Sequence, residues 1–118
     1  MDKRNPCLSL KHHGIRGKIC SDFLTVPVYD CAGCAVTLRV GELEPGCYDY
    51  GYAVHLPDGQ TFNKIPGQGS GWFDSRTNAL LYGAHAIRLA FASVLPPEAH
   101  GALLDKITVY LSPTLFDA

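Results

Sequence analysis

The sequence is short of charge and contains no long hydrophobic run. Of its 118 residues, 18% are charged and 47% are hydrophobic, which is too apolar for a disordered segment and sufficient for a buried core. No run approaches the ~18 uncharged apolar residues that a membrane-spanning helix needs. A chain of this length is expected to form one domain, which excludes a two-domain enzyme, a porin-like barrel and a long coiled coil.

The motifs of several enzyme classes are also missing. Residues 67–71 are rich in glycine, but their spacing matches neither the dinucleotide-binding pattern nor the Walker loop. Asp74, at the start of the helix expected next, would repel a phosphate. His85 and Arg88 share one face of that helix, but no nucleophile is tied to them by spacing. We therefore predict a protein without catalytic residues and without a bound organic cofactor.

Positive charge is concentrated at the start of the chain. Residues 1–20 hold five basic side chains against the single acid Asp2, so the remainder carries five basic and ten acidic residues. Such a block is typical of an arm that binds nucleic acid or an acidic partner, and equally of a solvated, poorly ordered terminus. We interpret residues 1–18 as a basic N-terminal arm and residues 19–118 as a single domain. The basic side chains of the arm are Lys3, Arg4, Lys11, Arg16 and Lys18.

Three segments alternate between apolar and polar residues with the period of a half-buried strand, and a fourth follows at 60–65. The three are 24–28, 36–40 and 50–56. Each join is three residues long and ends in glycine, as a hairpin loop with a final left-handed residue requires. The joins are 31–33, 44–46 and 57–59.

One register satisfies all three joins. It pairs Asp30 with Cys34, Leu43 with Cys47, and Leu56 with Gln60. These pairings set Val28, Val36 and Val54 in one row of the sheet, and they place every apolar set on the same face. The sequence thus predicts a four-stranded antiparallel meander in the order 1-2-3-4.

Helices are expected after the meander. Asp74 or Ser75 is a suitable cap for a long helix that runs to Leu95 and packs on one face of the sheet. Pro97 can open a second, short helix that runs to Lys106. Residues 107–111 fit either a continuation of this helix or a strand, because they include β-branched side chains. The fold class expected is therefore α+β.

Cys31 and Cys34 are candidate metal ligands, because two thiolates at this spacing can supply half of a zinc site. Cys7, His12 and His13 are the residues that could complete it. The alternative is a pair of structural cysteines flanking a turn, and a hairpin tip offers no positive charge to activate a thiol.

The start of the chain carries no apolar segment of the kind that a secretory signal has, so we expect a cytoplasmic protein with mostly reduced cysteines. Cys20 and Cys47 are predicted to lie ~10 Å apart, beyond the ~7 Å that a disulfide allows.

The outer face of the sheet is a candidate surface for nucleic acid or a partner. Arg39 and His55 fall on this face with Asn63, Tyr29 and Phe23, and small residues lie among them. Aromatic rings with basic neighbours can hold a nucleic-acid strand on a sheet. The alternative is that the terminal segment or a second subunit covers the face. The small residues are Ala35, Gly41, Gly51 and Ala53.

The end of the chain offers one further contact. Leu115 and Phe116 can fill an apolar pocket of a partner, and they resemble the peptides with which replication proteins bind the bacterial sliding clamp. Ser112 stands where those peptides usually have Gln. The alternative is that this tail folds back onto its own domain.

Residues 52–59, Tyr-Ala-Val-His-Leu-Pro-Asp-Gly, are followed by Ile-Pro-Gly and by a helix that opens Ser-Arg-Thr-Asn-Ala-Leu. This pattern resembles HicB-type antitoxin domains, and no activity is carried over from it, since a shared fold does not fix a function. From the residues we expect a small non-enzymatic binding or regulatory module that acts through contacts with a protein partner or with a second copy of itself. The alternative is a nucleic-acid-binding accessory protein that uses the basic arm and the outer sheet face.

Overall fold

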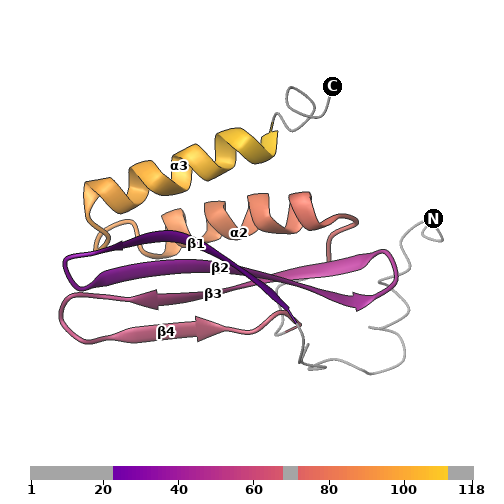
Figure 1. Ribbon diagram of the computed structural model, residues 1–118, viewed down its shortest axis with the longest axis horizontal. Coiled ribbons are helices and arrows are strands. Elements are labelled where there is room, and N and C mark those ends of the chain that lie inside the picture. The colour runs from indigo at the N-terminus through magenta and orange to yellow at the C-terminus, as the bar shows by residue number, and fades with distance from the viewer. Residues whose placement is uncertain (1–22, 68–71, 112–118) are drawn as a thin grey trace.

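The computed structural model describes residues 23–67 and 72–111. Four strands are followed by two helices (Figure 1). The strands form one antiparallel sheet in the order β1-β2-β3-β4, so the predicted α+β fold and meander are confirmed. The elements are β1 (Leu24–Cys31), β2 (Cys34–Glu44), β3 (Cys47–His55), β4 (Thr61–Lys64), α2 (Arg76–Ala90) and α3 (Pro97–Leu111).

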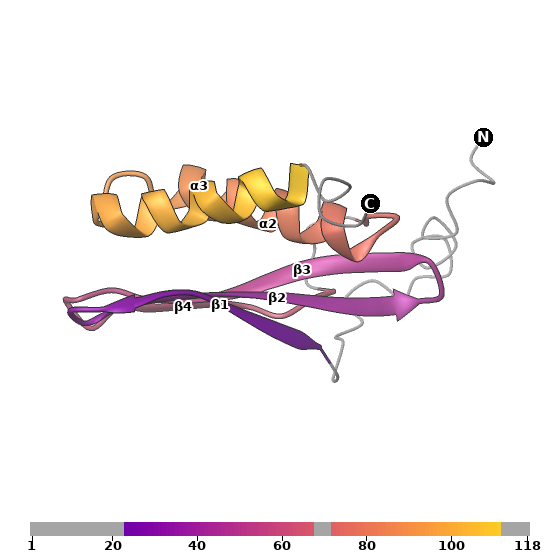
Figure 2. The same cartoon turned by 45° about the horizontal axis from the view of Figure 1, so that its top comes forward.

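Both helices lie on the same face of the sheet (Figure 2). Helix α2 packs over β2 and β3, while α3 packs against α2 and over β1. The helix layer is thus displaced toward the β1 edge, and within residues 23–67 and 72–111 no helix lies beyond α2 on the β4 side. The core between the layers is formed by alternate residues of β2 and by the inner sides of the helices, with Val36, Leu38, Ala84, Ile87 and Leu103 fully buried.

The first hairpin differs from the predicted register. Its loop has two residues, Ala32 and Gly33, both with positive φ (53° and 83°), which is the geometry of the tight turn that matches strand twist. Cys31 therefore pairs with Cys34, and a bulge at Val28 restores the predicted pairing beyond it. The predicted opposition of Val28 and Val36 is wrong: Tyr29 takes that place.

The second hairpin also contains a bulge. Glu44, rather than Leu43, pairs with Cys47, and the register shift between Glu42 and Glu44 leaves Leu43 as the extra residue. The predicted pairs from Val40–Tyr50 onward are confirmed. The third hairpin follows the prediction, with the Leu56 amide donating to the Gln60 carbonyl at 2.9 Å.

Helix α2 begins where the sequence predicts and ends earlier. The Ser75 side chain accepts a hydrogen bond from the Asn78 amide at 3.1 Å and caps the helix. The helix stops at Ala90 instead of Leu95. Phe91 leaves the helical conformation (φ −115°, ψ 25°), and the chain then turns, with the Val94 and Leu95 amides donating to the Phe91 carbonyl at 3.1 and 3.0 Å.

Helix α3 begins at Pro97 and continues through 107–111, so the ambiguous segment is helical and both helices have 15 residues. Ala99, Leu103 and Ile107 are buried on its inner side. Their spacing of four residues fits one face of a helix, and burying this face outweighs the preference of β-branched residues for strands.

Candidate functional site

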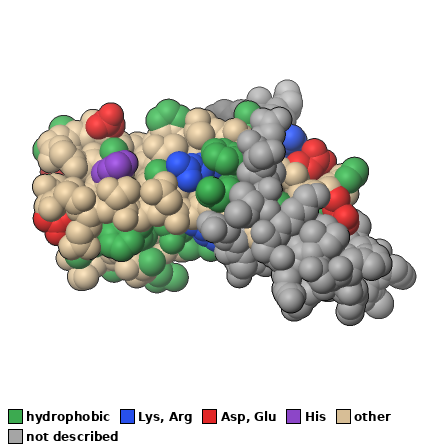
Figure 3. Space-filling model, turned by 90° about the horizontal axis from the view of Figure 1, so that it is seen from below, with side chains coloured by type: hydrophobic (Ala, Val, Ile, Leu, Met, Phe, Trp, Pro, Cys, Tyr) green, Lys and Arg blue, Asp and Glu red, His purple; other side chains and the backbone are tan. Residues whose placement is uncertain are grey.

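Neither described helix lies on the outer face of the sheet (Figure 2), and Figure 3 shows the molecule from this side. Basic side chains lie near the centre of the view, and acidic side chains lie toward the two ends. Hydrophobic side chains gather along the lower left rim. Arg39, His55 and Asn63 lie in the outward positions of β2, β3 and β4, as their pairing partners require. The predicted placement of these three residues is therefore confirmed.

Arg39 is the cation at the centre of the outer face. Its guanidinium carbon lies 5.2 Å from the centroid of the Phe23 ring, within range of a cation–π contact. One terminal nitrogen donates to the Lys64 carbonyl at 3.5 Å. Its Nε atom is buried and has no hydrogen-bond partner among the described residues. Much of this guanidinium is thus turned toward the protein itself.

His55 does not form a single site with Arg39. The strand partner of Arg39 is Gly51, four residues before His55 on β3, which separates the two side chains by roughly 13 Å along the sheet. The imidazole Nδ1 of His55 shares a hydrogen bond of 3.2 Å with the Thr61 hydroxyl. The paired residues Thr37 and Ala53 lie between the two basic side chains, which therefore do not converge on one ligand.

Two residues expected on the outer face have different roles. The bulge at Val28 turns Tyr29 to the helix side, where it packs against the core. At Gly51, a Cβ atom would lie 2.3 Å from the Lys64 carbonyl oxygen and 2.8 Å from the Pro66 ring. The chain after β4 therefore crosses the face at Gly51, and this glycine makes room for its own protein and not for a ligand.

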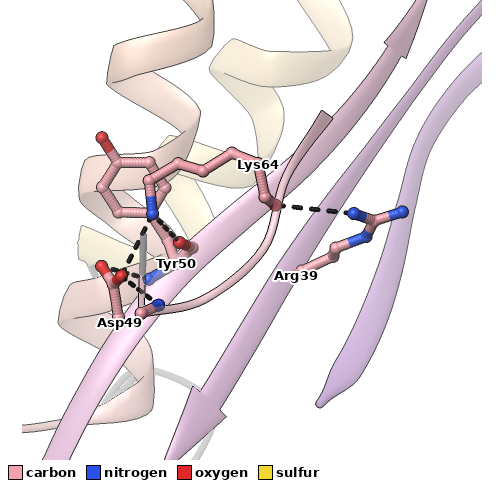
Figure 4. A network of polar contacts seen from close by, with 5 residues as sticks. Arg39, Asp49, Tyr50 and Lys64 are labelled. Carbon is pink, nitrogen blue, oxygen red and sulfur yellow. Dashed lines mark hydrogen bonds and ion pairs between the residues drawn. The ribbon is translucent and has the colours of Figure 1, made fainter. Parts of the chain in front are cut away.

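Asp49 and Lys64 hold this crossing in place (Figure 4). Asp49 is fully buried, and its Oδ2 lies 3.1 Å from the Lys64 ammonium, whose side chain is 12% exposed. The same oxygen accepts from the Gly67 amide at 2.6 Å, and Oδ1 accepts from the Tyr50 amide at 2.8 Å. The Lys64 ammonium also donates to the Tyr50 carbonyl at 2.5 Å and lies 4.4 Å from the Tyr50 ring centroid. The Asp49 carboxylate and the Lys64 ammonium thus find their opposite charge and their hydrogen-bond partners within the protein.

Burial lowers the pKa of Lys64 from its ordinary value, and the neighbouring Asp49 carboxylate opposes this shift. Desolvation disfavours the charged ammonium, while the carboxylate favours it. Because the cation already contacts an anion, a carbonyl and a ring, we assign Lys64 to holding the β4 connection rather than to binding a ligand. The sequence did not single out this pair. The available signal for the pair was Asp49 itself, an acidic residue within a predicted strand, opposite Gly41.

The thiols of Cys31 and Cys34 flank the first turn directly. Both are free, Cys31 being exposed and Cys34 buried. Burial raises the pKa of the Cys34 thiol, which disfavours the thiolate that metal binding and nucleophilic attack require. No group of three His, Cys, Asp or Glu side chains able to hold a metal occurs within 23–67 and 72–111. The further ligands considered, Cys7, His12 and His13, lie outside the described residues.

Cys47 is disulfide-bonded. Cys31 and Cys34 are free, so its partner lies outside the described residues. This finding corrects the expectation that Cys47 is reduced. The basic residues of the arm and the tail pair also lie outside the described residues, and their predicted contacts stay predictions. They are Lys3, Arg4, Lys11, Arg16, Lys18, Leu115 and Phe116.

An apolar surface, which the sequence did not single out, runs along the β4 side of α2. We call it the α2 flank and define it as Phe62, Tyr82 and Leu89, which are 37%, 54% and 77% exposed. The Phe62 ring packs at 5.0 Å on Phe91, next to the end of α2. The Tyr82 ring stacks at 5.1 Å on Phe73. The seven-residue spacing of Tyr82 and Leu89 places them on one side of the helix and was the available signal.

No family model, curated protein or solved structure matches the chain. No described helix is long and apolar enough to cross a membrane. Inference about function therefore starts from the surfaces of the molecule itself.

Proposed function

We propose that this protein is a small, non-enzymatic binding or regulatory module that acts through protein contacts. The observation that supports it most is the exposure of large apolar side chains on the helix layer and the β4 edge. Large apolar side chains exposed together on one part of a surface are typical of an interaction site. On the helices these side chains are Tyr82, Leu89, Leu104, Val109 and Leu111.

The polar side chains support the same proposal. The ion pair that the structure buries, Asp49 with Lys64, is engaged with the protein's own backbone. His55 bonds to Thr61 on an exposed strand end, and the Cys34 thiol is buried with a raised pKa. None of these groups combines an activated side chain with an open position for a substrate, as catalysis requires.

Nucleic-acid binding is the alternative function, and the Arg39–Phe23 pair favours it. A guanidinium and a ring on a sheet face that neither described helix covers are components of surfaces that stack bases. The proposed location is the cytoplasm in either case. The free thiols of Cys31 and Cys34 support this location, whereas the disulfide of Cys47 counts against it.

A photo-crosslinking experiment separates the two functions. One variant carries a photoreactive phenylalanine analogue in place of Leu89 on the α2 flank, and a matched variant carries it in place of Thr37 on the outer face. After irradiation in cells, mass spectrometry identifies the adducts. Protein adducts at position 89 are expected. Nucleic-acid adducts at position 37, with none at 89 and with steeply salt-dependent binding, would instead establish the alternative.

A further inference from the structure

We propose that two copies of this chain associate through the edges of their β4 strands, with the α2 flanks of both copies packed across the twofold axis. The inference rests on the proposed function and specifies its partner as a second copy. It would join the two sheets into one continuous sheet of eight strands, with the helix layers on one side.

The two edges of the sheet differ in their protection against such pairing. On β1, Pro27 lacks an amide hydrogen, a bulge follows between Pro27 and Tyr29, and Asp30 is exposed. Proline, bulges and charges are the devices by which sheet edges avoid pairing with other chains. On β4, residues 61–63 are Thr, Phe and Asn, without charge, proline or bulge. Its only ionisable residue is Lys64, whose ammonium faces Asp49.

The hydrogen-bond pattern of β4 fixes a register for the pairing. Leu56 and Gln60 form a hydrogen-bonded pair, and Phe62 lies opposite Val54 two residues farther along. Because bonded positions alternate in an antiparallel ladder, the amides and carbonyls of Thr61 and Asn63 point away from β3. A second, antiparallel β4 strand that pairs with the first about Phe62 can form hydrogen bonds with these amides and carbonyls. Thr61 of each copy then bonds to Asn63 of the other.

This register brings the apolar side chains together. Phe62 faces the same residue of the second copy at the position where side chains of an antiparallel pair approach most closely. Phe62 lies on the helix side, in contact with Phe91, so the pair forms at the end of α2. The exposed Leu89 precedes Phe91 by two residues, and Tyr82 lies farther back along the helix. Lys64 falls opposite Gln60, and no like charges meet. The surface is thus complementary to itself, as a twofold interface must be.

The surface area that the interface can bury sets the expected affinity of the dimer. At their measured exposures, the rings of Phe62 and Tyr82 offer on the order of 200 Å² for burial. A standard interface needs about 800 Å² per partner. Leu89 and the backbone and side chains of β4 add to this area, and the dimer belongs at the small end of stable interfaces. We expect a dissociation constant of about 1–100 µM.

Sedimentation of the full chain over about 1–500 µM tests the proposal. A denaturing gel without reductant excludes covalent dimers. Two variants disrupt the interface: Phe62→Lys sets like charges opposite each other, and Leu89→Lys changes a residue that is 77% exposed and so leaves the fold intact. The matched control is Leu104→Lys on α3, which is 45% exposed and lies away from β4.

We expect a concentration-dependent dimer of the natural chain, at least ~10-fold weaker in both variants and unchanged in the control. A chain that stays monomeric throughout, or a dimer weakened only by Leu104→Lys, overturns the proposal. The crosslinking at position 89 keeps the two proposals distinct. A monomeric chain that crosslinks to a different protein retains the proposed function and loses self-pairing.

Discussion

The ammonium nitrogen of Lys64 lies 3.1 Å from a carboxylate oxygen of Asp49, and both side chains are largely or wholly withdrawn from water. The same carboxylate accepts the amide of Gly67. The pair therefore ties the end of β4 to β3, at the point where the chain turns under Gly51. It holds the edge strand in place, and residues 61–63 of that strand are exposed among the described residues.

Asp49→Ala is expected to lower the free energy of unfolding by about 3–5 kcal/mol, because it leaves the Lys64 cation buried without its partner. Urea denaturation followed by circular dichroism measures the change. The control is Asp105→Ala, an exposed acid on α3, with an effect within about 0.5 kcal/mol. Equal effects of the two substitutions would show that the buried pair does not stabilise the fold.

Gly83 brings α2 close to the sheet. A Cβ atom there would lie 3.0 Å from Tyr50 Cβ and 3.1 Å from Leu38 Cδ2, whereas a Cβ at Gly101 in α3 meets nothing within 4 Å. Gly101→Ala should therefore raise stability by about 0.5–1 kcal/mol through helix propensity alone. Gly83→Ala should lower it by about 1–3 kcal/mol through overpacking. Thermal unfolding of both variants gives the signs, and stabilisation at both positions would contradict the close packing of α2.

Ala32 adopts a left-handed conformation with φ of 53° in the first turn. A side chain at this φ is strained, so Ala32→Gly should raise the unfolding free energy by about 0.5–1 kcal/mol. The same change at Ala102, inside α3, should lower it by a similar amount. A loss of stability at position 32 would favour the three-residue loop expected from the sequence over the two-residue turn.

The two free thiols should react at different rates. Cys31 is exposed, while Cys34 is buried and its pKa is raised by that burial. Alkylation near neutral pH, read by mass spectrometry of peptides, should modify Cys31 readily and Cys34 slowly, because the thiolate is the reacting form. In urea the two should react alike. Rapid modification of Cys34 in the folded protein would reopen a thiol-based activity.

The strand order was predictable because glycine-ended joins and period-two alternation point to the same sheet. The bulges were not, since a two-residue loop with a bulge at Val28 and a three-residue loop without one give Val26 and Leu24 the same pairing partners on β2. The bulge changes the candidate surface, because it moves Tyr29 from the outer face of the sheet to the core side. Composition alone cannot distinguish these solutions, because turn geometry and strand twist decide between them.

The α2 flank could not be predicted from the sequence for a different reason. Tyr82 and Leu89 fall outside the apolar stripe that packs on the sheet, and in a sequence they read as ordinary members of a hydrophobic helix. Their exposure follows from the position of α3, which covers the β1 side of α2, while no other described helix packs on the β4 side. The position of α3 depends on tertiary packing, and the hydrophobic periodicity of α2 could not predict it.

Hydrogen exchange of the Thr61 and Asn63 amides, measured residue by residue at low and high protein concentration, tests self-pairing through β4 most directly. These amides should exchange rapidly at about 1 µM and slow at least ~10-fold at a few hundred µM, while the amides of β1 keep their rates. Unchanged, rapid exchange of Thr61 and Asn63 at the highest concentration would contradict the pairing of two β4 edges.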